Sequence, residues 1–248
     1  MSTVIDTTSK KYIDYTKVFF ANGRGMHNGA YYYSKEIVEN IIPNVKTDRP
    51  WDTLGMKAVG SKDRAIVFIH SNINLDKVYK WLEKYDDQIC VVSAKHVYDW
   101  FVENGEKTIY LPLSVDVGYV EQFKTRKTKG TCYSGNRWKF KRADEDKNIP
   151  RDVDFPPENL PREELLKFIA PYKDLYAIGR CAIEGMILGC KIHPFFWRYM
   201  DPSIWKILDN RDAAKLLQRA LDMIEDDGHS VNCLDLIEYN KLIKKYNV

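Results

Sequence analysis

Apolar strand-like runs alternate with amphipathic segments through the first half of this 248-residue chain. Residues 17–21, 65–69, 88–93 and 108–112 have the composition of buried strands. Between them, at 30–42, 75–85 and 96–104, apolar residues recur at the spacing of one helix face. Parallel strands are joined by helical crossovers, so the alternation predicts an α/β fold with a parallel sheet covered on both faces.

Composition excludes several other classes of protein. Hydrophobic residues make up 44% of the chain and aromatic residues 13%, which is enough for real cores and excludes disorder. The five cysteines are scattered without CxxC spacing, as expected for buried thiols in a reducing cytoplasm. The first residues lack an apolar signal core, and no run approaches the roughly 18 apolar residues of a membrane span. We therefore expect a soluble, cytoplasmic protein without a membrane span.

Positive charge is concentrated in one stretch. The formal net charge is +3, yet residues 124–151 contain ten Lys or Arg against three acids. Residues 130–135 of this stretch resemble a strand and glycine turn. Residues 143–161, which overlap its end, resemble a proline-rich, charged loop. The stretch is a candidate phosphate site, although a solvated basic loop would have the same composition.

The second half has one distinctive segment, LYAIGRCAIEGMILGCKI at 175–192. Gly179 precedes a helix predicted at 180–188, and Gly189 stands where that helix should end. Arg180 and Glu184, four positions apart, could form a surface ion pair worth about 0.2–0.5 kcal/mol. Alternatively, the amides at the helix start attract a diphosphate and Glu184 accepts hydrogen bonds from sugar hydroxyls.

The run from Glu184 to Ile192 resembles the donor-binding motif of GT-B glycosyltransferases, E-A-M-x-x-G-x-P-V. The strand ending at Ser93, followed by LPLSVD at 111–116 and then Phe123, is similar to the end of a GT-B N-terminal domain, with Leu-Ser in place of the usual Asn-Gly. The resemblance implies two Rossmann-like domains, the second abbreviated. We place them at residues 1–123 and 124–233, followed by a terminal helix at 234–248 that in this family often packs on the first domain.

The resemblance also implies an activity, the transfer of a sugar from a nucleotide sugar to an acceptor hydroxyl, without a metal or other cofactor. The donor-binding residues that it implies are Gly135, Arg137, Lys139, Lys141, Gly179, Arg180 and Glu184. Cationic side chains would stabilise the departing diphosphate. Retaining enzymes of one subgroup have a further acid eight residues earlier, where this chain has Tyr176.

The acceptor side is less defined by the sequence. His27 and His70 follow predicted strands and are candidates for the base that accepts the acceptor proton, although packed histidines are the alternative. An incomplete G-x-G-x-x-G pattern at 22–29 argues against a nicotinamide enzyme. Compact forms of the family suit small genomes such as those of phages. A phage enzyme could act on a hydroxylated DNA base, so both DNA and glycans are candidate acceptors. Its location would then be the cytoplasm of the host cell. A non-catalytic GT-B-like protein that binds a nucleotide or nucleic acid is the alternative function.

Overall fold

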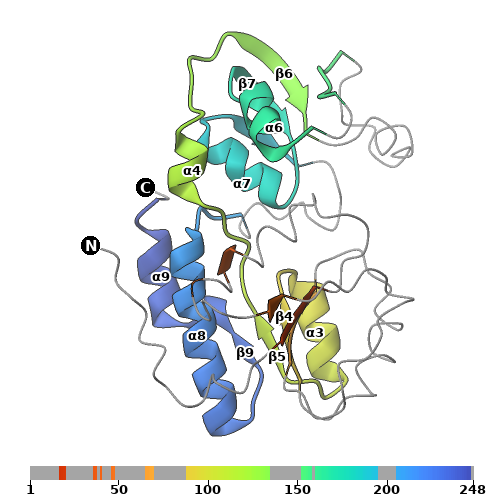
Figure 1. Cartoon of the computed structure of the whole chain (residues 1–248), viewed down its shortest axis with the longest axis vertical. Coiled ribbons are helices and arrows are strands. Elements are labelled where there is room, and N and C mark those ends of the chain that lie inside the picture. Colours follow the sequence, from red (N-terminus) through yellow and green to blue (C-terminus); the bar gives the residue numbers. More distant parts are fainter. Residues whose placement is uncertain are drawn as a thin grey trace. The chain divides into compact units, whose positions relative to one another are not determined.

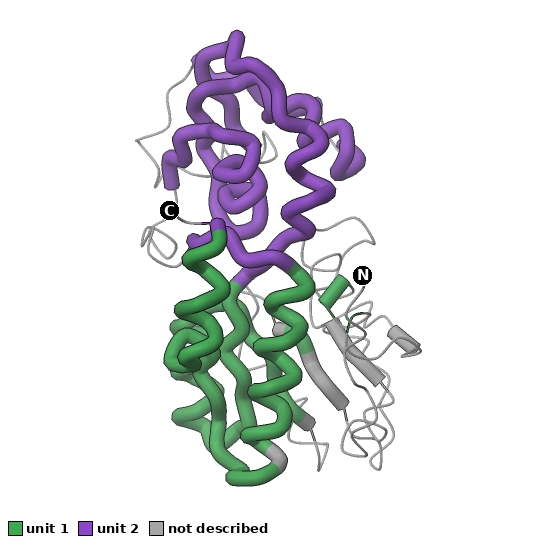
Figure 2. The backbone as a smooth tube through the Cα atoms, turned by 90° about the vertical axis from the view of Figure 1, so that its left-hand side faces the viewer, with its two compact units in different colours: residues 1–112, 210–245 green, residues 113–209, 246–248 purple. Residues whose placement is uncertain are grey.

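A computed structural model of the chain describes residues 17–20, 36–37, 40, 46–47, 65–69, 88–134, 152–157, 160–194 and 205–246. The chain divides into two compact units, coloured separately in Figure 2. Unit 1 comprises Met1–Pro112 and Asn210–Lys245, and unit 2 comprises Leu113–Asp209 and Tyr246–Val248. Each unit is built on its own parallel sheet.

Unit 1 contains a parallel sheet with the strand order β2-β1-β3-β4-β5-β9. The strands are β1 (Lys17–Phe20), β2 (Lys46–Thr47), β3 (Ala65–Ile69), β4 (Gln88–Val92), β5 (Thr108–Tyr110) and β9 (Val231–Asn232). The α/β class and the parallel sheet expected from the sequence are therefore confirmed, and the predicted strands agree with β1, β3, β4 and β5 to within two residues.

Two amphipathic helices of unit 1 follow from its sequence pattern (Figure 1). Helix α3 (Lys95–Glu103) contacts β4 and β5 and buries Val97 and Phe101, four positions apart. Helix α8 (Asn210–Asp227) contacts β5 and β9 and buries an apolar stripe that includes Leu217 and Leu221. At the start of α8, the side-chain amide of Asn210 donates a hydrogen bond to the Glu36 carboxylate.

Unit 2 contains a smaller parallel sheet, ordered β6-β7-β8. Its strands are β6 (Lys129–Tyr133), β7 (Tyr172–Tyr176) and β8 (Lys191–His193), and its helices are α4 (Val117–Glu121), α6 (Arg162–Ile169) and α7 (Arg180–Ile187). Asp154 adds a parallel bridge beside Cys132 of β6. The core of the unit consists of side chains from β6, β7 and the three helices, among them Val120, Leu166, Leu175 and Ile183.

The units do not divide where the sequence suggested. Residues 113–123 belong to unit 2 because Val115 bridges Asp209 and because Val117 and Val120 lie in the unit 2 core. Residues 210–233, predicted as part of the second domain, belong to unit 1 because β9 pairs with β5 and extends the first sheet. The terminal segment forms a 3-10 turn, η4 (Cys233–Asp235), and helix α9 (Ile237–Ile243), both also in unit 1.

No helix in the described part of the chain is long and apolar enough to cross a membrane.

Candidate functional site

Helix α7 begins directly behind a glycine turn. Gly179 lies between β7 and α7 with φ +60°, a left-handed conformation that glycine adopts without strain. Its carbonyl accepts hydrogen bonds from the amides of Ala182 and Ile183, and no side chain caps the helix. An uncapped helix start presents backbone donors and the positive end of the helix dipole, which together favour an anion.

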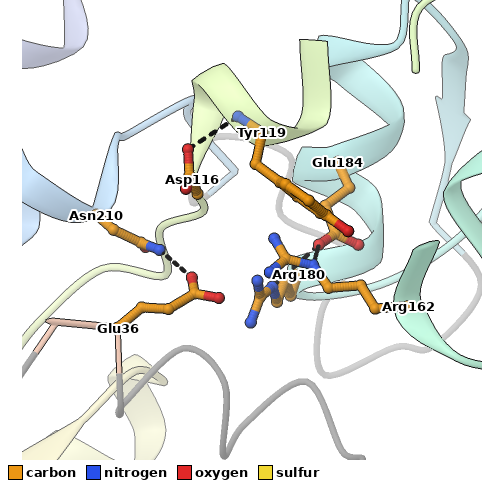
Figure 3. A network of polar contacts seen from close by, with 7 residues as sticks. All are labelled: Glu36, Asp116, Tyr119, Arg162, Arg180, Glu184 and Asn210. Carbon is orange, nitrogen blue, oxygen red and sulfur yellow. Dashed lines mark hydrogen bonds and ion pairs between the residues drawn. The ribbon is translucent and has the colours of Figure 1, made fainter. Parts of the chain in front are cut away.

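Glu184 lies in the second turn of α7 and is held by two guanidinium groups (Figure 3). Its Oε1 accepts a hydrogen bond from Nε of Arg180 and another from Nε of Arg162, both at 3.1 Å. The exposed fractions are 3% for Glu184, 7% for Arg180 and 18% for Arg162. The Arg180–Glu184 ion pair, one of the two alternatives considered from the sequence, therefore forms, but it is buried and shared with α6 and does not lie on the surface.

The two oxygens of the Glu184 carboxylate have different surroundings. Both hydrogen bonds reach Oε1, and no donor among the described residues reaches Oε2. A carboxylate oxygen has more than one lone pair and gains from accepting a hydroxyl donor when it is shielded from water. The arginines thus fix the orientation of the carboxylate and leave one oxygen able to accept from a ligand hydroxyl.

Arg162 also connects α6 to α4. Its guanidinium carbon lies 5.0 Å from the ring centroid of Tyr119, within the range of a cation–π contact. The amide of Tyr119 in turn donates to Asp116 Oδ1 at 2.9 Å, and Asp116 is the N-cap of α4. Helices α4, α6 and α7 therefore meet around the Glu184 carboxylate, as Figure 3 shows.

Helix α7 lies very close to the sheet at Gly185. A Cβ atom added there would lie 2.4 Å from Cδ2 of Leu175 and 2.8 Å from Cδ1 of Ile192. Only a glycine fits this contact without displacing β7 or β8 side chains. The glycine after the acid in the sequence motif is therefore explained by the packing of α7.

The end of β6 lies beside the first turn of α7. Ser134 follows β6, and its amide and hydroxyl both donate to the Tyr176 carbonyl, at 3.1 and 3.4 Å. Ser134 also forms a hydrogen bond with Cys181, the second residue of α7. Burial and the nearby Glu184 carboxylate raise the pKa of Cys181 to about 12, against the opposing effects of Arg180, Ser134 and Arg162, so its thiol stays protonated at neutral pH.

The structure describes three of the predicted site residues and brings them together. Gly179, Arg180 and Glu184 are brought together by α7 and the turn before it. The remaining predicted residues lie outside the described residues, namely His27, His70, Gly135, Arg137, Lys139 and Lys141. The segment with the last four begins at Ser134, so its first residue is anchored next to α7.

Sequence reasoning missed Arg162 and Tyr119. A signal for Arg162 exists in hindsight, because it is the first residue of α6, where the helix dipole disfavours a cation and favours acids such as Glu163 and Glu164. A basic residue at a helix start needs a compensating carboxylate. Glu184 of α7 is that carboxylate.

Within the described residues, no group of three or more His, Cys, Asp or Glu is placed to hold a metal ion. Two such side chains, His193 of β8 and Asp174 of β7, contact each other, with 2.7 Å between His193 Nε2 and Asp174 Oδ1. The His193 ring also stacks on the ring of Tyr176.

Comparisons of the chain with protein-family models, with curated proteins and with solved structures found no match.

Proposed function

We propose that unit 2 binds a nucleotide-sugar donor at the start of α7 and that the protein is a GT-B type glycosyltransferase. The observation that supports this most directly is the Glu184 carboxylate, oriented by Arg162 and Arg180 through Oε1 and with Oε2 left to accept a ligand hydroxyl. It lies one turn inside a helix whose uncapped start favours an anion. We therefore propose that the donor diphosphate binds at the helix start and that the ribose hydroxyls bind at the carboxylate.

The position of α7 relative to the unit 2 sheet supports the same proposal. In open parallel sheets, ligands bind outside the carboxyl ends of the strands. Helix α7 starts at the carboxyl end of β7, and Ser134 at the carboxyl end of β6 contacts its first turn. The basic residues Arg137, Lys139 and Lys141 follow Ser134 within a few positions and are the proposed partners of the leaving diphosphate.

The proposed reaction joins an acceptor hydroxyl oxygen to the anomeric carbon while the bond from that carbon to the nucleoside diphosphate breaks. The diphosphate leaves with the bonding electron pair, and a base takes the hydroxyl proton. His27 and His70 are the proposed bases, and they follow β1 and β3, which are neighbouring parallel strands of unit 1. Each unit is by itself an α/β unit with a parallel sheet, compatible with a Rossmann-like fold, and we propose that unit 1 serves the acceptor.

Incubation of the purified protein with a panel of UDP- and GDP-sugars tests the proposal. We expect release of the nucleoside diphosphate, by slow hydrolysis without acceptor and faster when hydroxylated DNA or glycan acceptors are added. Calorimetric titration of UDP, GDP and their sugars measures binding separately. If no nucleotide or nucleotide sugar binds, the proposal is wrong.

A specific observation favours a second candidate, a binding protein without turnover. Tyr176, at the position where one retaining subgroup has an acid, stacks on His193 at a centroid distance of 4.9 Å. A tyrosine engaged in this way does not replace a carboxylate in catalysis. Nucleotide binding in calorimetry, without nucleotide release from any sugar donor and acceptor of the panel, would favour this candidate over the transferase.

A further inference from the structure

Basic residues lie at the amino ends of the unit 2 strands, at the opposite edge of the sheet from the start of α7. We define the amino-edge cluster as Lys124, Arg126, Lys127, Lys129, Lys173 and Lys191. Lys129 is the first residue of β6, Lys173 the second of β7 and Lys191 the first of β8. Because the three strands are parallel, these residues share one edge of the sheet.

The loop between α4 and β6, which contains Lys124 and Lys127, lies next to the end of α7 at the same edge of the sheet. Gly189 has φ +82°, and the amides of Gly189 and Cys190 bond the carbonyls of Met186 and Gly185, which is a Schellman ending. A Cβ atom added to Gly189 would lie 3.7 Å from Cε of Lys127 and 4.0 Å from Cε of Lys124. The two lysine side chains therefore flank the negative end of the α7 dipole, which stabilises their charge.

Within the described residues, no member of the amino-edge cluster forms an ion pair with a carboxylate. Lys127 donates to the Ala170 carbonyl at 2.7 Å and lies 3.1 Å from Cys190 Sγ, and Lys129 lies 3.5 Å from the Tyr172 hydroxyl. These are neutral partners. The other members are exposed and make no hydrogen bond there.

Among the described residues, three acidic groups lie near this charge. Glu121 ends α4 three positions before Lys124, and Asp174 is in register with Lys191 but is paired with His193. Asp154 Oδ2 accepts a hydrogen bond from the Tyr172 hydroxyl at 2.6 Å, and that hydroxyl lies 3.5 Å from Lys129 Nζ. The cluster outnumbers these carboxylates. The surface therefore has a net positive charge. By contrast, the charge of Lys167 in α6 is paired, at 2.7 and 2.9 Å from Glu163 and Glu164.

We propose that the amino-edge cluster binds the phosphodiester backbone of duplex nucleic acid. Neighbouring strands are about 4.8 Å apart, so lysines from three strand starts extend over roughly 10 Å. Duplex DNA presents one phosphate charge per roughly 1.7 Å of its axis, so several phosphates lie within reach of this width. The chemistry recognised is the backbone rather than a base sequence.

The surroundings favour a duplex over two other polyanions. Single strands are bound largely by stacking of bases on exposed aromatic rings, and membranes by exposed apolar side chains beside the cations. The exposed large apolar residues of the described chain are Val102 and Ile237, and both belong to unit 1. The amino-edge cluster therefore offers charge alone. This inference does not rest on the proposed glycosyl transfer, which uses the opposite edge of the sheet.

Fluorescence anisotropy of a labelled 24-base-pair DNA duplex tests the proposal with the full-length protein. We expect binding at low salt, with a slope of log K against log salt of about −0.9 for each phosphate neutralised. With four phosphates neutralised, affinity falls roughly 100-fold between 50 and 200 mM salt.

The decisive variant combines Lys124→Gln, Arg126→Gln, Lys173→Gln and Lys191→Gln, which leaves the structural contacts of Lys127 and Lys129 in place. We expect the slope to become shallower by about 0.9 for each removed charge that met a phosphate, with unchanged melting temperature. Lys167→Gln is the matched control, since it removes an exposed but already paired charge from the same unit, and its slope should equal that of the wild type.

Three results would overturn the inference. The first is no duplex binding at 50 mM salt, and the second is duplex binding that the fourfold variant leaves unchanged. The third is stronger binding to vesicles containing phosphatidylserine, or to single-stranded DNA, than to the duplex. Nucleotide-sugar binding by the fourfold variant is measured in parallel, so that loss of the donor site and loss of the duplex site are distinguished.

Discussion

Arg162 Nε and Glu184 Oε1 lie 3.1 Å apart although the two residues are separated by 22 positions in the chain. This contact joins the start of α6 to the second turn of α7, and Arg180 bonds the same oxygen from within α7. One carboxylate thereby fixes two guanidinium groups in a buried region. Its removal should affect the stability of unit 2 as well as any ligand.

We predict that Glu184→Ala lowers the free energy of unfolding by about 3 kcal/mol, because it leaves buried guanidinium charges without their carboxylate. The control is Glu163→Ala, which removes an exposed carboxylate paired with Lys167 and should change stability by about 1 kcal/mol or less. Urea denaturation followed by circular dichroism measures both. Equal small effects would mean that the Glu184 network contributes little to the fold.

Gly185→Ala should destabilise the protein by about 1–3 kcal/mol through overpacking, because the new methyl group collides with Leu175 and Ile192. Gly118→Ala in α4 is a matched glycine in a helix, where an added Cβ meets only Asp116 Oδ1 at 3.7 Å. That control should raise stability by about 0.5–1 kcal/mol, the usual gain for a helical glycine. A Gly185→Ala protein as stable as the wild type would show that α7 can move away from the sheet.

Alkaline pH should destabilise the fold through its buried thiols. Burial raises the pKa of Cys132 and Cys181 to about 12, and burial also raises the pKa values of Cys90, Cys190 and Cys233. The ordinary pKa of a cysteine thiol is 9.0, so well below pH 9 the thiols are protonated in both the folded and the unfolded state. Above it the unfolded chain loses thiol protons that the folded chain keeps, so stability falls as pH rises toward 12.

The predicted loss is about 1.4 kcal/mol per pH unit for each thiol that titrates only in the unfolded chain. Urea midpoints at pH 8 and pH 10.5, in the presence of a reductant, measure it. Cys181→Ala should lose less stability over this interval than the wild type. Identical pH dependence in the two proteins would remove Cys181 from the explanation.

The regular elements could be predicted from the sequence because their signals are local. The strand 65–69 and the helix at 180–188 correspond to β3 and α7 within one residue. Strand β9 has only two residues, Val231 and Asn232, and is defined by its pairing with β5 more than 100 positions earlier. Such a pairing leaves no local pattern, which is why the sequence alone assigns residues 210–233 to the second domain.

The candidate site was predicted in part for the same reason. Gly179, Arg180 and Glu184 lie on one short segment, so their proximity follows from helical spacing. Arg162 and Tyr119 come from other elements, and only the packing of α4 and α6 on α7 brings them to Glu184. The burial of the acid follows from that packing and could not be read from an i, i+4 spacing.

Arg137 is the proposed partner of the leaving diphosphate. Arg137 follows Ser134 by three positions, and Ser134 contacts the first turn of α7, where the donor diphosphate is proposed to bind. Negative charge on the diphosphate is greatest in the transition state, so Arg137→Ala should lower kcat by about 10²–10³-fold and weaken donor binding less. Steady-state kinetics of sugar transfer and calorimetric donor binding give the two quantities. Arg219→Ala, an exposed arginine of α8 in unit 1, is the control and should match the wild type. A change confined to KM would mean that Arg137 holds the diphosphate equally in the ground state and the transition state, so that it anchors the donor without accelerating its departure.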